Sequence, residues 1–251
     1  MNVRFEKLNF HYSRKKQVLK NIDLTLPSGK FSAILGPNGS GKTTLMKQIN
    51  RILIPQSGRV TLSGVDVASM SPGDMARTIA YVPQMTGGML AGSVMDTILL
   101  GRKPYIKWKP SEEDLEIVSK CLMRFHLEEI AQRDFNALSG GQRQTVLIAR
   151  ALAQTPRLYL FDEPVSFLDV RNQLEIMNTA RDLVNRDGKT VIMVLHDLNV
   201  ALRYADHVVM MKEGEVFAQG SAQEVITEEN ILAVYGTHAR IRNGEYVITS
   251  L

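Results

Sequence analysis

Three short runs of apolar residues stand out along the chain, and each leads directly into a residue that can do chemistry. They are FSAIL (31–35) before Gly36, LYLF (158–161) before Asp162, and VIMVL (191–195) before His196. Runs of this length without polar alternation are typical of strands buried on both faces, as in a parallel sheet covered by helices. Because ligands bind at the carboxyl ends of such strands, we expect a functional site there.

Alternating apolar and polar residues predict strands of a different kind near both ends of the chain. The stretches VRFEKLNF and NIDLTL, the latter with Ile22, Leu24 and Leu26, indicate half-buried antiparallel strands. Residues 208–220 predict a hairpin that turns at Glu213-Gly214. The stretch IRNGEYVI predicts another hairpin, which turns at Asn243-Gly244.

Residues 86–155 show no pattern of a buried strand, which predicts an all-helical insertion. In PSEEDLEIVSKCLMRF, Ser111 and Asp114 match a capping box, and we expect Leu115, Val118 and Leu122 to share one helix face. The chain is therefore expected to be a single domain, residues 1–251. Its core would consist of residues 1–85 and 156–251, and its helical subdomain of residues 86–155.

Composition limits the class of protein only mildly. The 251 residues are 44% hydrophobic and 22% charged, as in ordinary globular proteins. The net charge of +4 is spread along the chain and does not indicate nucleic-acid binding. The single cysteine, Cys121, excludes an internal disulfide and suits a reducing compartment; in its helical context we expect it in the core. The N-terminus does not resemble a signal peptide, and no run of about 18 apolar residues could span a bilayer.

Residues 36–44, GPNGSGKTT, match the phosphate-binding pattern G-x-x-x-x-G-K-[ST] between a predicted strand and a predicted helix. Glycines let backbone N–H groups close around phosphates without a Cβ clash, and the helix start adds partial positive charge. We expect Lys42 to reach the β- and γ-phosphate oxygens and the Thr43 hydroxyl to bind Mg²⁺. The expected nucleotide site comprises Gly36, Pro37, Asn38, Gly39, Ser40, Gly41, Lys42, Thr43 and Thr44.

Two carboxylates follow the second apolar run. A carboxylate at the end of a buried strand is destabilising unless a cation is paired with it, so Asp162 is expected to be a second Mg²⁺ residue. Neighbouring strand residues point to opposite sides, so Glu163 can do different work. We assign Glu163 to orienting and polarising the attacking water.

A second glycine-rich helix start, LSGGQ, occupies residues 138–142. Ser139 and the N–H groups at a helix start form an anion site. This helix belongs to the predicted insertion, and a projecting insertion would keep the two loops of one chain off the same γ-phosphate. Two copies facing head to tail could share it. The expected contact residues are Ser139, Gly140, Gly141 and Gln142.

These motifs, in this order, resemble the ABC ATPase family along nearly the whole chain. The resemblance and the strand pattern imply an α/β fold with a P-loop NTPase (RecA-like) core and a mostly parallel sheet. An N-terminal antiparallel β subdomain and an inserted all-helical subdomain would complete it. The resemblance also implies hydrolysis of ATP with Mg²⁺, and a head-to-tail dimer. Each ATP would lie between the phosphate loop of one copy and Ser139 of the other.

The resemblance assigns four more residues. Gln84 in YVPQ matches the loop glutamine that touches Mg²⁺ or its water, and His196 in VLHD matches the switch histidine on the γ-phosphate. Asp169 in SFLD matches the loop that crosses the dimer interface, and Tyr12 resembles the aromatic that stacks on adenine. The family usually has a small residue at the position of Phe167, so its bulky ring raises the question of how that loop packs.

Two longer stretches, residues 93–118 and 196–236, are similar to ATP-binding subunits of importers for metal chelates. This similarity implies a separate transmembrane permease, an extracytoplasmic substrate-binding protein and a peripheral position on the cytoplasmic face of the inner membrane of a bacterium or archaeon. An iron(III)-siderophore is the first expectation for the cargo, with vitamin B12, haem or molybdate open. Tyr105 and Trp108 are expected either to contact the permease or to be buried anchors.

Three other functions share some of these motifs. A soluble ABC ATPase of iron–sulfur cluster assembly has similar size and motifs, but the two importer-like stretches count against it. A nucleic-acid machine usually carries a long coiled coil or two tandem cassettes, and the sequence has neither. A P-loop kinase would leave LSGGQ and His196 without a role.

Overall fold

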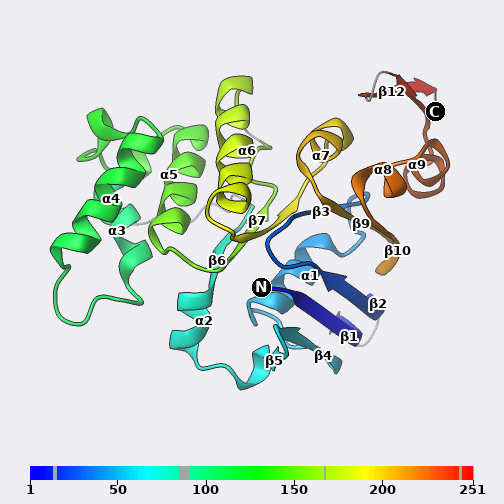
Figure 1. Ribbon diagram of the computed structural model, residues 1–251, viewed down its shortest axis with the longest axis horizontal. Coiled ribbons are helices and arrows are strands. Elements are labelled where there is room, and N and C mark those ends of the chain that lie inside the picture. Colours follow the sequence, from blue (N-terminus) through cyan, green and yellow to red (C-terminus); the bar gives the residue numbers. More distant parts are fainter. Residues whose placement is uncertain (14–15, 85–90, 167, 243–244, 251) are drawn as a thin grey trace. The chain divides into compact units, whose positions relative to one another are not determined.

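The computed structural model describes residues 1–13, 16–84, 91–166, 168–242 and 245–250 (Figure 1). The chain divides into two compact units. Unit 1 is made of Met1–Met70 and Thr179–Leu251, and unit 2 is Ser71–Asn178. The second boundary falls within helix α6 (Val170–Asn185).

Unit 1 begins with an antiparallel sheet, as the alternating pattern near the N-terminus predicted. Its strand order is β2-β1-β4-β5, and β1, β2 and β4 lie side by side in Figure 1. On β2 the side chains of Ile22, Leu24 and Leu26 are buried, and Asp23 and Thr25 between them are exposed. The strands are β1 (Val3–Ser13), β2 (Lys16–Leu26), β4 (Ser57–Leu62) and β5 (Val65–Asp66).

A second group of strands in unit 1 has the order β10-β9-β3-β8. Strand β3 pairs in parallel with both β8 and β9, and every residue of β3 and β8 is buried, which the apolar runs predicted. Strands β9 and β10 form the predicted hairpin, in which Glu213 and Gly214 have φ of +50° and +87°. The strands are β3 (Phe31–Leu35), β8 (Thr190–Val194), β9 (His207–Lys212) and β10 (Glu215–Gly220).

The rest of unit 1 is built mainly from short helices. They are α1 (Lys42–Ile49), α7 (Leu198–Tyr204), α8 (Ala222–Val225) and α9 (Glu228–Tyr235). The chain then forms a pair of antiparallel strands, β11 (His238–Arg242) and β12 (Glu245–Ser250). The turn predicted at Asn243-Gly244 lies outside the described residues.

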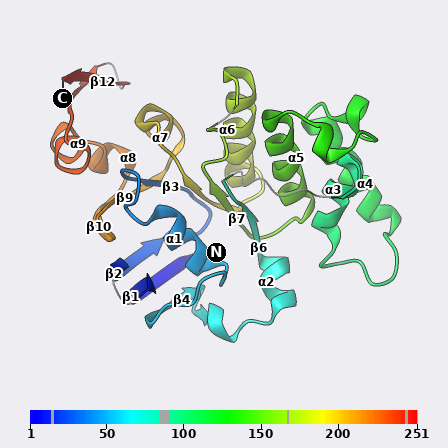
Figure 2. The ribbon, with the colours of Figure 1, turned by 180° about the vertical axis from the view of Figure 1, so that it is seen from behind.

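Unit 2 contains a parallel strand pair and a group of helices. Among the described residues from 91 to 155, every regular element is helical, apart from an isolated bridge between Ser93 and Asp134. Helices α3, α4 and α5 gather together in both views (Figure 2). The elements are α2 (Pro72–Thr78), β6 (Ile79–Val82), α3 (Val94–Leu99), α4 (Glu112–Arg124), α5 (Gly140–Ala153) and β7 (Leu158–Asp162).

Helix α4 begins with the predicted capping box of Ser111 and Asp114. Leu115, Val118 and Leu122 lie on one face of this helix, as predicted; Val118 and Leu122 are buried, whereas Leu115, in the first turn, is 42% exposed. Asp114, next to Leu115, is buried instead. Cys121 lies in the core as expected, and burial raises the pKa of its thiol to about 11.

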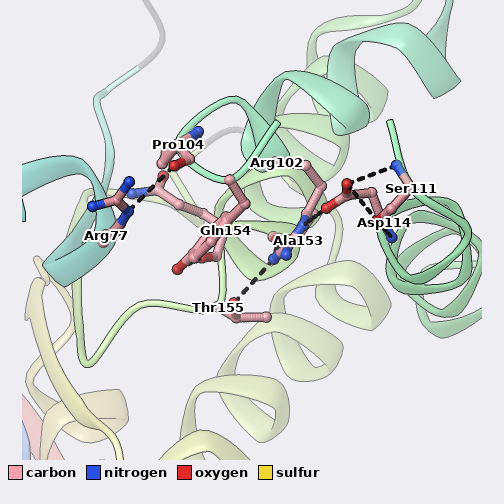
Figure 3. Close-up of polar contacts among 9 residues, drawn as sticks. Arg77, Arg102, Pro104, Ser111, Asp114, Ala153, Gln154 and Thr155 are labelled. Carbon is pink, nitrogen blue, oxygen red and sulfur yellow. Dashed lines mark hydrogen bonds and ion pairs between the residues drawn. The ribbon is translucent and has the colours of Figure 1, made fainter. Parts of the chain in front are cut away.

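The buried side chain of Asp114 belongs to a polar cluster that joins α4, α5 and the segment after α3 (Figure 3). Arg102 Nε donates to Asp114 Oδ1 at 2.8 Å, and both side chains are nearly buried. Arg102 Nη1 also donates to Ala153 O at 2.8 Å and to Thr155 Oγ1 at 3.1 Å. Every described charge in this cluster is therefore compensated, as a buried ion pair requires.

Tyr105 and Trp108 follow this cluster. The Arg102 guanidinium lies 4.2 Å from the centroid of the Tyr105 ring, so Tyr105 is partly anchored by a cation–π contact. Trp108 is 98% exposed, which excludes the buried-anchor alternative for that residue.

Candidate nucleotide-binding site

The phosphate loop connects β3 to α1 in unit 1 and has a backbone that only glycine tolerates. Gly36 has φ of +144°, and a Cβ atom there would lie 2.3 Å from the carbonyl oxygen of Met211. Gly41 has φ of +102°, and a Cβ atom there would lie 2.8 Å from a side-chain carbon of Leu19. Gly36 is thus required by the packing as well as by the backbone angle, whereas at Gly41 the backbone angle is the main requirement.

Lys42 begins α1, and its side chain folds back toward the loop. Its ammonium donates to the carbonyl oxygens of Gly36 at 2.8 Å and Pro37 at 3.0 Å. The Ser40 hydroxyl in the same loop is buried and has no hydrogen-bond partner in the described part of the chain. A lysine ammonium, a helix start and a buried orphan hydroxyl fit a phosphate group, which accepts hydrogen bonds from all three.

Tyr12 and His196 belong to the same unit as the loop. The Tyr12 ring is 62% exposed and packs edge-on against Phe10, with ring centroids 4.9 Å apart. Its hydroxyl lies 3.2 Å from Thr44 Oγ1, which places an exposed aromatic ring beside the first turn of α1. His196 is exposed and lies between the end of β8 and Asp197, the N-cap of α7.

The two predicted carboxylates lie in unit 2 at the end of β7. Asp162 is fully buried and accepts a hydrogen bond from the Tyr81 hydroxyl at 3.1 Å. Glu163 follows it in the left-handed region, with φ of +52°. A non-glycine residue in this region is strained by about 1–3 kcal/mol and often marks a functional site. Strand β7 ends at Asp162, so Glu163 lies outside the strand and the alternation that the sequence suggested does not extend to it.

Gln84 contacts the predicted water-polarising residue directly. Its Nε2 donates to Glu163 Oε2 at 2.8 Å. The family resemblance assigned Gln84 to the metal or its water, and the contact with Glu163 is an addition to that prediction. Tyr81 was missed altogether, because only the parallel register of β6 on β7, with Tyr81 opposite Leu160, brings its hydroxyl to Asp162.

Ser139 is the N-cap of α5. Its Oγ accepts from the Gln142 N–H at 3.3 Å, and Gln142 Oε1 accepts from the Ser139 N–H at 3.1 Å, which makes a capping box. Ser139 and Gly140 are exposed. Capping uses one lone pair of the hydroxyl and leaves its proton able to be donated, so a cap and an anion contact are compatible.

Asp169 lies just before α6. Its Oδ1 accepts from the Asn172 N–H at 2.8 Å, and its Oδ2 accepts from Asn172 Nδ2 at 3.1 Å. A helix-capping role is therefore present, and the interface role of Asp169 stays a prediction. Phe167 lies outside the described residues.

The predicted site residues thus fall into two sets. Unit 1 holds the phosphate loop, Tyr12 and His196. Unit 2 holds Gln84, Ser139, Asp162, Glu163 and Asp169. Within the described ranges, no group of three or more His, Cys, Asp or Glu side chains could hold a metal ion. Thr43 in unit 1 and Asp162 in unit 2 each carry a side-chain oxygen, the kind of ligand that Mg²⁺ takes while it keeps phosphate and water ligands.

The family of the chain follows from its similarity to known proteins. The profile of the ABC transporter family matches residues 19–166, more than half of the chain. The chain belongs to the ABC transporter family. It is an ATP-binding subunit of that family and an ATPase, and it binds nucleotide.

The similarity to relatives and to solved structures extends over almost the whole chain. An achromobactin transport ATP-binding protein of Dickeya dadantii is 42% identical over 226 residues, which are 89% of this chain and 84% of that protein. An inward-facing structure provisionally described as a metal-chelate type ABC transporter matches with a TM-score of 0.82 and 29% identity, over 99% of this chain and 97% of that one. An ATP-binding cassette solved as a dimer in a post-hydrolysis state with ADP and Pi matches with a TM-score of 0.79 and 30% identity, over 88% and 98%.

These matches confirm the α/β fold of an ABC ATPase that the sequence predicted, with its parallel strands, its antiparallel β region and its helices. None of the helices in the described part of the chain is both long and apolar enough to cross a membrane.

Proposed function

We propose that the chain is the ATP-hydrolysing subunit of an ABC importer that takes up a metal chelate through separate transmembrane permease subunits. The observation that carries this proposal is the similarity of nearly the whole chain to the achromobactin transport subunit and to the metal-chelate type transporter. An iron(III)-siderophore is the proposed cargo. The chain would act at the cytoplasmic face of the membrane, and an extracytoplasmic binding protein would deliver the cargo.

ATP binding is proposed to use both sets of site residues. In unit 1, the loop N–H groups and Lys42 would bind the β- and γ-phosphates, and the exposed Tyr12 ring would stack on adenine. His196 would contact the γ-phosphate. Mg²⁺ held by Thr43 and Asp162, with Gln84 at the metal or its water, would neutralise charge on the phosphate oxygens.

Glu163 is the proposed base. Its carboxylate would accept a hydrogen bond from the attacking water and polarise it, and Gln84 already holds one of its oxygens at 2.8 Å. The strained backbone at Glu163 supports this assignment, because such strain is often found at functional sites. Replacing Glu163 by Gln should keep ATP binding and stop hydrolysis, which would trap a nucleotide-bound dimer.

We further propose that each ATP is shared by two copies of the chain, with Ser139 of one copy donating to the γ-phosphate bound by the other. The solved dimeric cassette with ADP and Pi supports a dimer of this kind. Hydrolysis would remove the γ-phosphate bridge and favour opening of the pair.

The test distinguishes the helix-capping role of Ser139 from its proposed contact with the γ-phosphate. Asp and Asn both cap helices as well as Ser does, so Ser139→Asp and Ser139→Asn should leave α5 intact. The Asp carboxylate would repel the γ-phosphate, whereas the neutral Asn would not. We expect Ser139→Asp and Lys42→Ala to be inactive alone, and their mixture to regain one working pocket per mixed pair. A mixture as inactive as either parent, despite demonstrated pairing, would refute the shared site.

The cargo is tested separately. The chain, co-expressed with its permease and reconstituted in vesicles, should support ATP-dependent accumulation of a ferric siderophore from the side of the binding protein. Accumulation of vitamin B12, haem or molybdate alone would exclude the siderophore. Co-purification with scaffold proteins of iron–sulfur assembly and with no membrane protein would exclude the importer.

A further inference from the structure

The C-terminal strand pair of unit 1 is tied to the helix that follows His196. The side chain of Asn199, near the start of α7, makes two hydrogen bonds with the backbone of Tyr246 in β12. Its Nδ2 donates to Tyr246 O at 3.1 Å, and its Oδ1 accepts from the Tyr246 N–H at 2.6 Å. One amide thus satisfies both backbone groups of Tyr246, as a neighbouring strand would.

The backbone between His196 and Asn199 is held from both directions. On one side, the Leu195 N–H donates to Ile34 O at 3.2 Å, which ties the end of β8 to β3. On the other side, Asp197 Oδ1 caps α7 by accepting from the N–H groups of Asn199 at 2.7 Å and Val200 at 3.1 Å. His196 lies between these two attachments. A shift of the start of α7 would therefore move the histidine backbone, because no loop separates the two.

The side chains of Asp197 and Asn199 in this turn have different hydrogen-bond partners. Asp197 is exposed and binds only its own helix start in the hydrogen bonds above. Asn199 reaches a segment 47 residues away in the sequence. Asn199 therefore links α7 to the C-terminal strands, whereas Asp197 holds the turn locally.

The C-terminal region is also tied to β9. Lys212 Nζ, at the end of β9, donates to Ala233 O in α9 at 2.7 Å. Asn199 and Lys212 thus connect the segment from α9 to β12 with two other elements of unit 1, α7 and β9.

We propose that Asn199 is a positioning residue for His196 and that the β11–β12 pair is the support against which it acts. By this contact the C-terminal strands set where the histidine meets the terminal phosphate, without touching nucleotide themselves. The inference rests on the proposed function, in which His196 contacts the γ-phosphate.

The test compares ATP hydrolysis by the full-length chain and its variants. Asn199→Leu keeps the size of the side chain and removes both hydrogen bonds. Asn199→Asp keeps the acceptor for the Tyr246 N–H and removes the donor. Asn230→Ala is the matched control, because it removes a similar bond, from Asn230 Nδ2 to Val225 O at 2.9 Å, within the same C-terminal region. A chain that lacks residues 237–251 removes the support itself.

We expect Asn199→Leu and the shortened chain to lower kcat by about 10- to 100-fold, as small misplacements of a reacting group do. The KM for ATP and the affinity for a fluorescent ATP analogue should stay within about twofold, since the phosphate loop itself is unchanged. Asn199→Asp should fall between Asn199→Leu and the parent, and Asn230→Ala should equal the parent. In a His196→Ala background, Asn199→Leu should lower kcat no further.

Three results would overturn the proposal: a parental kcat in Asn199→Leu, an equal loss in Asn230→Ala, or an additive loss in the His196→Ala background. The histidine variant also separates this inference from the proposed function. Parental hydrolysis by His196→Ala would remove the role of His196 and this inference with it. An inactive His196→Ala beside a fully active Asn199→Leu would remove this inference alone.

Discussion

Replacing Asp114 by alanine should destabilise the protein far more than the loss of a helix cap would. Asp114 accepts from Arg102 Nε at 2.8 Å, from the Ser111 N–H at 3.0 Å and from Ser111 Oγ at 2.8 Å. Arg102 and Asp114 have side chains only 6% and 7% exposed. Without the carboxylate, the buried guanidinium keeps neutral acceptors in Ala153 and Thr155 but has lost the opposite charge of the pair.

Breaking a buried ion pair from one side typically costs about 3–5 kcal/mol. For a chain of this length, 1 kcal/mol shifts Tm by about 2–4 °C, so Asp114→Ala should lower Tm by about 6–20 °C. Asp96→Ala is the matched control, because Asp96 forms the same capping box with Ser93 but is exposed. Its loss should lower the free energy of unfolding by only about 1 kcal/mol.

Thermal unfolding of the two variants is the first assay. A double replacement, Arg102→Met with Asp114→Leu, is the second, and it should be more stable than Asp114→Ala because no buried charge is left uncompensated. Equal Tm values for Asp114→Ala and Asp96→Ala would show that the ion pair contributes nothing beyond the cap. In that case the reasoning from burial is wrong.

The same cluster predicts a dependence of stability on pH. The Ser111 N–H and then Arg102 lower the pKa of Asp114 from its ordinary value of about 4 to about 2. A lowered pKa stabilises the fold at pH values above about 4, and this contribution is lost as the pH falls toward 2. The stability difference between the parent and Asp114→Asn should therefore be constant from pH 7 to about 4 and shrink below that. A difference that shrinks between pH 7 and 5 would contradict this.

Three smaller predictions concern other parts of the chain. Gly36→Ala should weaken ATP binding at least about tenfold, or about 1.4 kcal/mol, because its methyl group would lie 2.3 Å from Met211 O; unchanged affinity in a nucleotide titration would contradict the packing. Trp108→Ala should change the free energy of unfolding by no more than about 0.5 kcal/mol, since the ring is 98% exposed, and a larger loss in urea unfolding would count against that exposure. Cys121 should react with a thiol reagent only slowly in the native protein and rapidly in denaturant, because burial raises the pKa of its thiol to about 11; fast native labelling at pH 8 would contradict this.

Local sequence patterns were sufficient to predict the buried strands, the turn between β9 and β10 and the start of α4. The apolar runs predicted β3, β7 and β8 to within a residue, Glu213-Gly214 predicted the β9–β10 turn, and Ser111 with Asp114 predicted the start of α4. These features depend on the periodicity of burial, on φ preferences and on hydrogen bonds across three residues, all of which are encoded within a few neighbouring positions. The phosphate-binding motif could also be identified from the sequence, because the loop requires glycine at fixed spacings.

Contacts between distant segments could not be predicted in the same way. Tyr81 meets Asp162 only through the register of β6 on β7, Gln84 meets Glu163 across 79 residues, and Asn199 meets Tyr246 across 47. The exposure of Leu115 and the burial of Asp114 could not be predicted either, because the neighbouring segments decide which part of a helix is covered, and here they place Arg102 against Asp114. The sequence by itself determined which local elements form and which chemical groups they carry. Only the tertiary structure decided which of these groups meet, because pairing register and packing are set by the whole chain at once.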